Sequence, residues 1–165
     1  MTATFRVLIA DKIAADGLAP LREDPRFELI TKPGLSLPDL TQALTEVDAV
    51  IVRSAAKVPR EAMAATTRLK VIGRAGVGVD TIDVDAATEK GIAVLNVAPG
   101  YIETDINRAY LNDPVHGEKV RARTATGRAG TPADIAKFVA VLYTERIAFL
   151  TGESICIDGG HSVSL

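Results

Sequence analysis

Hydrophobic positions follow two alternating patterns over the first hundred residues. Short, continuous apolar runs occur at 6–10, 27–31, 49–53, 69–72 and 92–97. Strands that are covered on both faces, as in parallel sheets, have continuous apolar runs of this kind instead of alternating apolar and polar positions. We therefore predict five buried strands in this part of the chain.

The segments between these runs have helical spacing. A helix is predicted over 37–47, where apolar residues recur every three or four positions after the capping residue Ser36. Further helices are predicted near 13–21, from 59 to 64 and from 83 to 90. Strands that alternate with helices in this way predict a parallel sheet with helices on both faces, joined by right-handed crossovers.

The pattern changes after residue 100. Residues 101–130 are polar and are predicted to form helical turns within a long excursion. Thr131 and Pro132 are typical of a helix start, and Glu153–Ile157 forms a last apolar strand. The predicted fold class is a single α/β domain over 1–165, with about six parallel strands in the flavodoxin-like or Rossmann-like order 2-1-3-4-5-6.

Composition narrows the function classes. The 165 residues include 19 basic and 21 acidic side chains, for a net charge of −2, and no tryptophan. This balance gives no electrostatic footprint for nucleic acid or for an anionic membrane surface. No stretch approaches the roughly 20 apolar residues that a membrane span needs. With a single cysteine the chain can form no internal disulfide, so we expect a cytoplasmic protein.

The isolated polar residues suggest no metal site. His116 and His161 lie far apart in the sequence, and neither has a ligand partner at a metal-binding spacing. Cys156 lies between two isoleucines of the last strand and is predicted to be a buried small hydrophobe.

Residues 1–96 resemble the D-2-hydroxyacid dehydrogenase family, of the phosphoglycerate dehydrogenase type. The strings that carry the resemblance are VLIADKI at 7–13, IVRSA at 51–55 and VIGRAGVGVD at 71–80. In that family this segment is most of the substrate-binding domain, which has a flavodoxin-like topology. The resemblance therefore implies the same parallel sheet as the hydrophobic pattern.

Residues 96–165 resemble a different family, the C-terminal part of the short-chain dehydrogenases/reductases. The carrying strings are NVAPGYIETD at 96–105, RAGTP at 128–132 and IDGG at 157–160. The two resemblances meet inside one predicted strand, so we interpret the chain as a chimera of two α/β fragments, 1–96 and 97–165.

The first resemblance implies an oxyanion site. In that family the matching positions contact the carboxylate or phosphate of the substrate; here they are Arg53, Ser54, Arg74, Ala75, Gly76, Val77 and Gly78. Guanidinium groups and exposed backbone N–H groups bind oxyanions well. Solvated arginines at strand ends are an equally good interpretation. The glycine spacing G-x-x-G-x-G differs from the G-x-G-x-x-G of a pyrophosphate loop.

The second resemblance implies a remnant of a nicotinamide site. In the reductases the matching loop lies beside the cofactor; its positions here are Pro99, Gly100, Ile102 and Thr104. A structural strand-to-helix turn is the favoured interpretation, because this loop alone cannot orient a dinucleotide. We therefore expect no cofactor, with weak NAD(P)(H) binding as the alternative.

The motifs of catalysis are missing from this stretch. No tyrosine is followed four residues later by lysine, and neither family's cofactor fingerprint is present. We therefore predict a chimeric scaffold that folds but is not an enzyme and has no catalytic residues. The alternatives left open are a small-oxyanion binder and a weak NAD-dependent oxidoreductase of 2-hydroxy acids. In the reductases the last helix and strand form subunit contacts, so a homodimer through these elements is expected.

Overall fold

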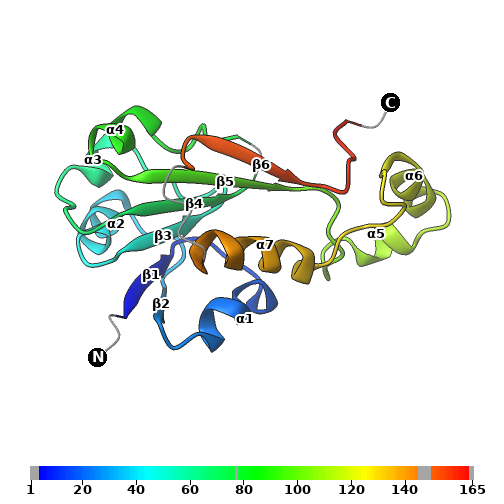
Figure 1. Ribbon diagram of the computed structural model, residues 1–165, viewed down its shortest axis with the longest axis horizontal. Helices are drawn as coiled ribbons and strands as arrows, with labels where there is room; N and C mark the ends of the chain where they lie inside the picture. The colour runs from blue at the N-terminus through cyan, green and yellow to red at the C-terminus, as the bar shows by residue number, and fades with distance from the viewer. Residues whose placement is uncertain (1–3, 77, 145–149, 164–165) are drawn as a thin grey trace.

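A six-stranded parallel sheet forms the centre of the molecule (Figure 1). The computed structural model describes residues 4–76, 78–144 and 150–163. The strand order is β2-β1-β3-β4-β5-β6, and every neighbouring pair is parallel. The predicted fold class and strand order are therefore confirmed. The strands are β1 Phe5–Ile9, β2 Phe27–Thr31, β3 Ala49–Val52, β4 Val71–Ala75, β5 Ala93–Pro99 and β6 Glu153–Ile157.

Helices cover both faces of the sheet, and two more project beyond its end (Figure 1). Helices α2, α3 and α4 lie on one face, and α1 and α7 on the other. The helices are α1 Ala15–Glu23, α2 Leu37–Leu44, α3 Arg60–Met63, α4 Val84–Glu89, α5 Arg108–Asn112, α6 His116–Arg123 and α7 Pro132–Thr144. Helix starts follow the predicted capping chemistry: the Ser36 side chain accepts from the N–H of Asp39, and that of Asp83 from the N–H of Ala86.

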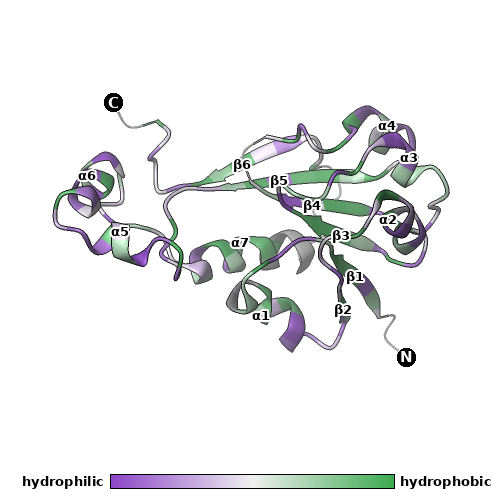
Figure 2. Cartoon of the chain, turned by 180° about the vertical axis from the view of Figure 1, so that it is seen from behind, coloured by the Kyte–Doolittle hydropathy of each residue, from purple (hydrophilic) through white to green (hydrophobic). Residues whose placement is uncertain are grey.

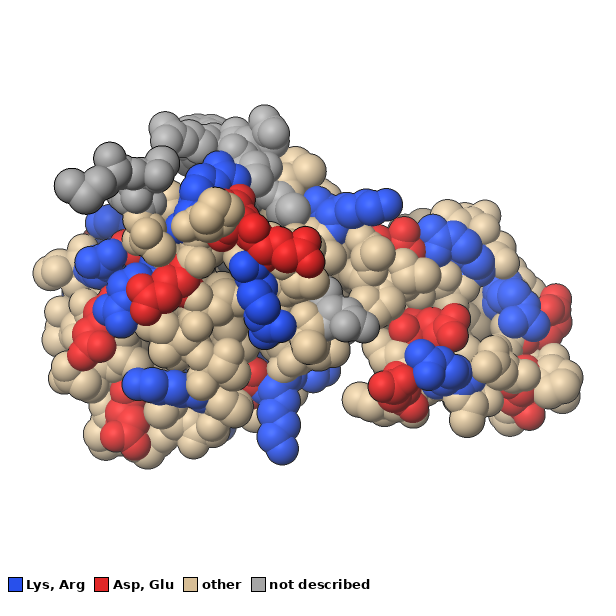
Figure 3. All heavy atoms as spheres, turned by 90° about the horizontal axis from the view of Figure 1, so that it is seen from below, with Lys and Arg blue, Asp and Glu red and all other residues tan. Residues whose placement is uncertain are grey.

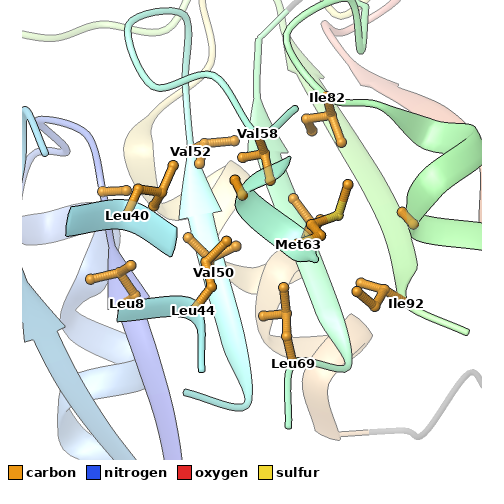
Figure 4. Close-up of a cluster of buried hydrophobic side chains, with 14 of the residues drawn as sticks. Leu8, Leu40, Leu44, Val50, Val52, Val58, Met63, Leu69, Ile82 and Ile92 are labelled. Atoms are coloured by element: carbon orange, nitrogen blue, oxygen red, sulfur yellow. The ribbon is translucent and has the colours of Figure 1, made fainter. Parts of the chain in front are cut away.

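The larger core lies between the sheet and helices α2, α3 and α4 (Figure 4). Leu44, Val50 and Met63 are fully buried there. A smaller cluster on the opposite face includes Val7 and Leu18 and is covered by α1. In Figure 2 the central strands are predominantly apolar, whereas α6 is mostly polar. Most of the apolar burial therefore comes from the half of the chain before residue 97.

Helices α5 and α6 pack on each other and form a lobe beyond the carboxyl end of the sheet (Figures 1 and 3). A neck joins the lobe to the body, where Gly130 donates to the carbonyl of Tyr101 and Glu103 donates to that of Gly130, both at 2.8 Å. Figure 3 shows the narrowing at this neck, with acidic and basic side chains mixed on the surface. The predicted excursion over 101–130 is this lobe.

The prediction for Cys156 is wrong, because its side chain is exposed. Cys156 pairs with Ala98 in the edge strand β6, two residues after the exposed Ser154 on the same face of the sheet. An apolar run predicts a buried strand only where helices cover both faces of the sheet. Among the described residues, no helix covers the face of β6 that carries Cys156.

Candidate functional site

The loops predicted to bind ligands gather at one edge of the sheet. The strands are parallel, so the carboxyl ends of β3, β4 and β5 lie side by side, and the segments that follow them share this edge. Clefts outside the carboxyl ends of parallel strands are where open α/β sheets bind ligands. The structure thus brings both groups of predicted site residues to the same edge.

The loop after β3 is held by a buried carboxylate that the sequence analysis did not single out. Asp11 is only 6% exposed, and its Oδ2 accepts from the backbone N–H groups of Arg53 at 2.6 Å and Ala56 at 3.1 Å. The side chains of Arg53 and Ser54 are exposed at this edge. One guanidinium N–H of Arg53 donates to the carbonyl of Lys12 at 3.2 Å. Asp11 therefore positions the loop while Arg53 and Ser54 face solvent.

Arg74 binds its own loop. The side chain is 5% exposed. Its guanidinium donates to the hydroxyl of Thr81 at 3.2 Å and to the carbonyl of Gly78, and it lies 3.6 Å from the carboxylate of Asp80. These contacts make Arg74 the centre around which the loop after β4 folds. The predicted contact of Arg74 with a substrate oxyanion stays a prediction.

The remaining residues of the first predicted site surround Arg74. Ala75 ends β4, and the N–H of Gly76 donates to the carbonyl of Val97 at 2.9 Å. A Cβ on Gly76 would lie 3.3 Å from the Arg74 guanidinium, so the glycine lets the side chain fold close to the backbone. Gly78 has φ +76°, a left-handed conformation that glycine adopts without strain. Val77 lies outside the described residues.

The second predicted site is a tight turn after β5. The N–H of Gly100 donates to the carbonyl of Ile157 at 3.1 Å. A Cβ on Gly100 would lie 2.6 Å from the Cβ of Asp158. Pro99 closes the strand in register with Ile157. Glycine is needed at position 100 because the chain after β6 passes directly against it.

Ile102 and Thr104 also make contacts within the chain. Ile102 pairs with Gly130 at the neck of the lobe. The N–H and hydroxyl of Thr104 donate to Asn107 Oδ1 at 2.9 and 3.3 Å. The N–H of Gly100 and both donors of Thr104 are therefore engaged within the chain. Their cofactor role stays a prediction.

The turn after β6 carries a stabilised carboxylate. Asp158 accepts from the N–H groups of Gly160 at 2.9 Å and Ser162 at 2.7 Å. Hydrogen bonding by the hydroxyl of Ser162, together with these N–H groups, lowers the pKa of Asp158. A carboxylate beside Gly100 repels anions, whereas the guanidinium groups of Arg53 and Arg74 belong to the carboxyl ends of β3 and β4.

Two properties of the described residues concern other ligand classes. No group of three or more His, Cys, Asp or Glu side chains among them could hold a metal ion. No helix in the described ranges is long and apolar enough to cross a membrane.

The fold and this edge define an α/β protein of the dehydrogenase type. The profile of the family described as D-isomer specific 2-hydroxyacid dehydrogenase, catalytic domain, matches residues 7–106. The chain belongs to this family. A second profile, described as enoyl-(acyl carrier protein) reductase, matches residues 84–162. The predicted union of two dehydrogenase fragments is confirmed, and the two matches overlap within 84–106, which includes β5.

Curated relatives agree with the first match. The chain is 46% identical over 96 residues to D-3-phosphoglycerate dehydrogenase of Bacillus subtilis. These aligned residues cover 58% of this chain and 18% of the relative. It is 34% identical over 167 residues to the same enzyme of Mycobacterium leprae, covering 96% of this chain and 31% of the relative. The chain thus spans less than a third of the length of these relatives.

Solved structures agree on the fold. A short-chain dehydrogenase family protein from Francisella tularensis superposes with a TM-score of 0.66 at 15% identity, covering 97% of this chain and 99% of that chain. A putative NAD-binding, D-isomer specific 2-hydroxyacid dehydrogenase from Polaromonas superposes with a TM-score of 0.51 at 24% identity, covering 56% of this chain and 30% of that chain.

The expectation that the chain is not an enzyme is overturned by these comparisons. Relatives 33–46% identical to it carry the name of an oxidoreductase. The expectation rested on motifs missing from 165 residues, and the 96 of these residues that align with the Bacillus subtilis enzyme make up only 18% of that enzyme. Motifs that are missing from a stretch of this length carry no information about catalysis.

Proposed function

We propose that this chain is the acid-binding part of an oxidoreductase that acts on 2-hydroxy acids. The observation that supports the proposal is the pair of adjacent loops after β3 and β4. One presents the exposed Arg53 and Ser54, and the other is folded around the buried Arg74. Both loops lie at the edge of the sheet where α/β proteins bind ligands.

Some residues of the two loops are suited to bind an anion, and others hold the loops in position. Arg53 supplies a guanidinium and Ser54 a hydroxyl, which are suitable donors for a carboxylate or a phosphate. Asp11 and Arg74 hold the backbones of the two loops from beneath. The loops that carry the hydrogen-bond donors are therefore held in place before an anion binds. Preformed loops lower the entropic cost of forming the complex.

The names of the relatives suggest 3-phospho-D-glycerate as the first ligand to test. Both of its anionic groups are chemically suited to Arg53 and to loop N–H groups. A nicotinamide dinucleotide would accept the hydride in such a reaction. The N–H of Gly100 and the N–H and hydroxyl of Thr104 donate within the chain, so no contact with the dinucleotide is assigned to these groups.

The test is a calorimetric titration of the purified chain with 3-phospho-D-glycerate. We expect saturable binding that Arg53→Gln weakens by about tenfold, because a charge-assisted hydrogen bond is lost. Arg26→Gln is the matched control, since Arg26 is ion-paired with Asp24 at 2.5 Å in the loop before β2. Equal binding by the Arg53 and Arg26 variants, or no binding by the unaltered chain, would refute the proposal.

A further inference from the structure

A separate hollow lies beside the predicted oxyanion site. It has a volume of about 340 Å³ and is bounded by the end of β1, the start of α2 and the loop after β3. From β1 the chain crosses to β2 through α1 on one face, whereas from β3 it crosses to β4 through α3 on the other. The hollow therefore lies where the direction of the crossovers reverses, the position at which doubly wound sheets bind ligands.

The walls of the hollow are apolar. Ala10 and Leu40 are buried beneath it at 1% and 3% exposure, and Leu35 is packed against the main core. The remaining lining residues are Gly34, Leu37, Ala55, Ala56, Lys57 and Pro59. A Cβ on Gly34 would meet nothing within 4 Å, so this glycine leaves space at the wall. These surfaces favour a ligand with a hydrocarbon body.

Hydrogen bonds hold the two sides of the hollow in place. Gly34 donates from its N–H to the carbonyl of Ala10 at 3.3 Å, which fixes the segment before α2. On the other side, the carboxylate of Asp11 accepts from the N–H of Ala56. The site is therefore formed before a ligand arrives, which reduces the cost of binding.

One charged side chain lines the hollow, and it is cationic. Lys57 is exposed, and within the described ranges its ammonium takes part in no ion pair. A lysine ammonium is a single point charge, unlike the forked guanidinium that suits a phosphate dianion. A monoanion with an apolar body satisfies both the walls and this charge.

We propose that the hollow binds a small aliphatic carboxylate, with its chain against Leu35 and Leu40 and its carboxylate beside Lys57. At roughly 30 Å³ of liquid volume per water molecule, the space of about 340 Å³ corresponds to about eleven water molecules. A linear or branched acid of five to six carbons, with about seven to eight non-hydrogen atoms, fits within it. This site uses neither Arg53 nor Arg74, so it does not depend on the proposed function.

The experiment is a titration of the ¹⁵N-labelled chain with hexanoate, followed by amide chemical shifts. We expect saturable shifts that are largest at Gly34, Ala55 and Ala56. Ala55→Phe, which places a ring in the hollow from an exposed position, weakens binding at least about tenfold. Lys57→Gln weakens it about fivefold through loss of the ion pair. Unsaturated shifts, or hexanoate affinity unchanged in Ala55→Phe, would overturn the proposal.

Control variants and control ligands distinguish binding in the hollow from nonspecific effects of the substitutions or of the ligand. Ala64→Phe and Lys70→Gln make the same exchanges at exposed positions away from the hollow and should leave hexanoate affinity unaltered. Hexanol should bind more weakly than hexanoate, and acetate should not saturate. Equal affinity for hexanol and hexanoate would contradict the role of Lys57. Arg53→Gln should lower the affinity for 3-phospho-D-glycerate but not for hexanoate, so that either proposal can fail without the other.

Discussion

The side-chain amide of Asn96 in β5 donates from Nδ2 to Ser154 Oγ in β6 at 3.0 Å. The two residues are register partners across the sheet, and Asn96 has no exposed surface. The other half of the amide, Oδ1, is the one buried side-chain acceptor in the described residues without a hydrogen-bond partner. This pair joins a strand that both family profiles match to a strand that only the reductase profile matches.

Removing one member of this pair should cost more than removing both. Ser154→Ala leaves the buried Nδ2 of Asn96 without an acceptor, so we expect a loss of about 1–3 kcal/mol in the free energy of unfolding. The double variant Asn96→Leu with Ser154→Ala should be close to the unaltered protein, because no buried polar group is then unsatisfied. Urea unfolding of Ser154→Ala, Asn96→Leu and the double variant measures this coupling, and additive losses would contradict it.

Two leucines of α2 provide a test of the core. Leu44 is fully buried, whereas Leu37 on the same helix is 46% exposed. Leu44→Ala should lower the free energy of unfolding by about 2–5 kcal/mol, because it leaves a cavity in the main core. Leu37→Ala should change it by less than about 1 kcal/mol. Chemical denaturation checks both values, and comparable losses would show that α2 does not pack as described.

The turn after β5 should not accept a larger residue than glycine. A Cβ at position 100 would lie 2.6 Å from Asp158 Cβ and 2.7 Å from its Cα, so Gly100→Ala should destabilise by about 1–3 kcal/mol. Gly17→Ala is the control, because Gly17 lies inside α1 and its Cβ would lie 3.7 Å from the side chain of Ile13, an ordinary contact. That exchange should stabilise by about 0.5–1 kcal/mol. A neutral Gly100→Ala in thermal unfolding would disprove the close approach.

Acid should weaken the fold through Asp48. Burial alone would raise the pKa of Asp48, but hydrogen bonds from Arg68 at 2.9 Å and from the N–H of Arg6 at 2.8 Å outweigh burial and lower it. A carboxylate with a lowered folded-state pKa stabilises the protein fully above its unfolded pKa of about 3.9, and this stabilisation is lost as the pH falls through the folded value.

The consequence can be measured with Asp48→Asn. This variant should be less stable than the unaltered protein at pH 7 by about 1–2 kcal/mol, and the difference should disappear at low pH. Glu23→Gln, at an exposed position with no ion pair among the described residues, should show no such dependence. A difference between Asp48→Asn and the unaltered protein that persists below the transition would exclude this role.

We propose that two copies associate through α7 and β6. β6 is the edge strand, and Val141 on α7 is 46% exposed. Sedimentation should show a dimer at micromolar concentrations, which Val141→Glu shifts toward the monomer. Val115→Glu on the lobe, where Val115 is 59% exposed, should leave the dimer intact. A monomer at every concentration would exclude the interface.

The fold could be predicted because its signals are local. The strand over 27–31 and the sixth strand over 153–157 have the predicted bounds. The strand predicted at 69–72 is instead β4 Val71–Ala75. The apolar run in the sequence stops at Ile72, but the strand continues through Gly73, Arg74 and Ala75, of which Arg74 is buried. A polar residue inside a strand is invisible to a pattern that reads only hydrophobicity.

The site was less predictable because its organisation depends on contacts between distant residues. Asp11 follows an apolar run directly. Nothing in the sequence indicates that its carboxylate accepts a hydrogen bond from the N–H of Arg53, 42 positions away. Arg74 was predicted to contact a ligand, which stays a prediction, and its hydrogen bonds to Thr81 and Gly78 had no signal in the sequence. Residue type identified the chemistry of these groups, whereas their partners depended on the way the loops fold.

The double match of β5 has a consequence for how such chains arise. A strand that both family profiles recognise supplies the same hydrogen-bonding ladder to whichever fragment follows it. A junction within that strand keeps both halves of a sheet in register, so carboxyl-edge loops of two families lie on one sheet. New ligand sites can then evolve on one half of the protein while the other half continues to provide the core.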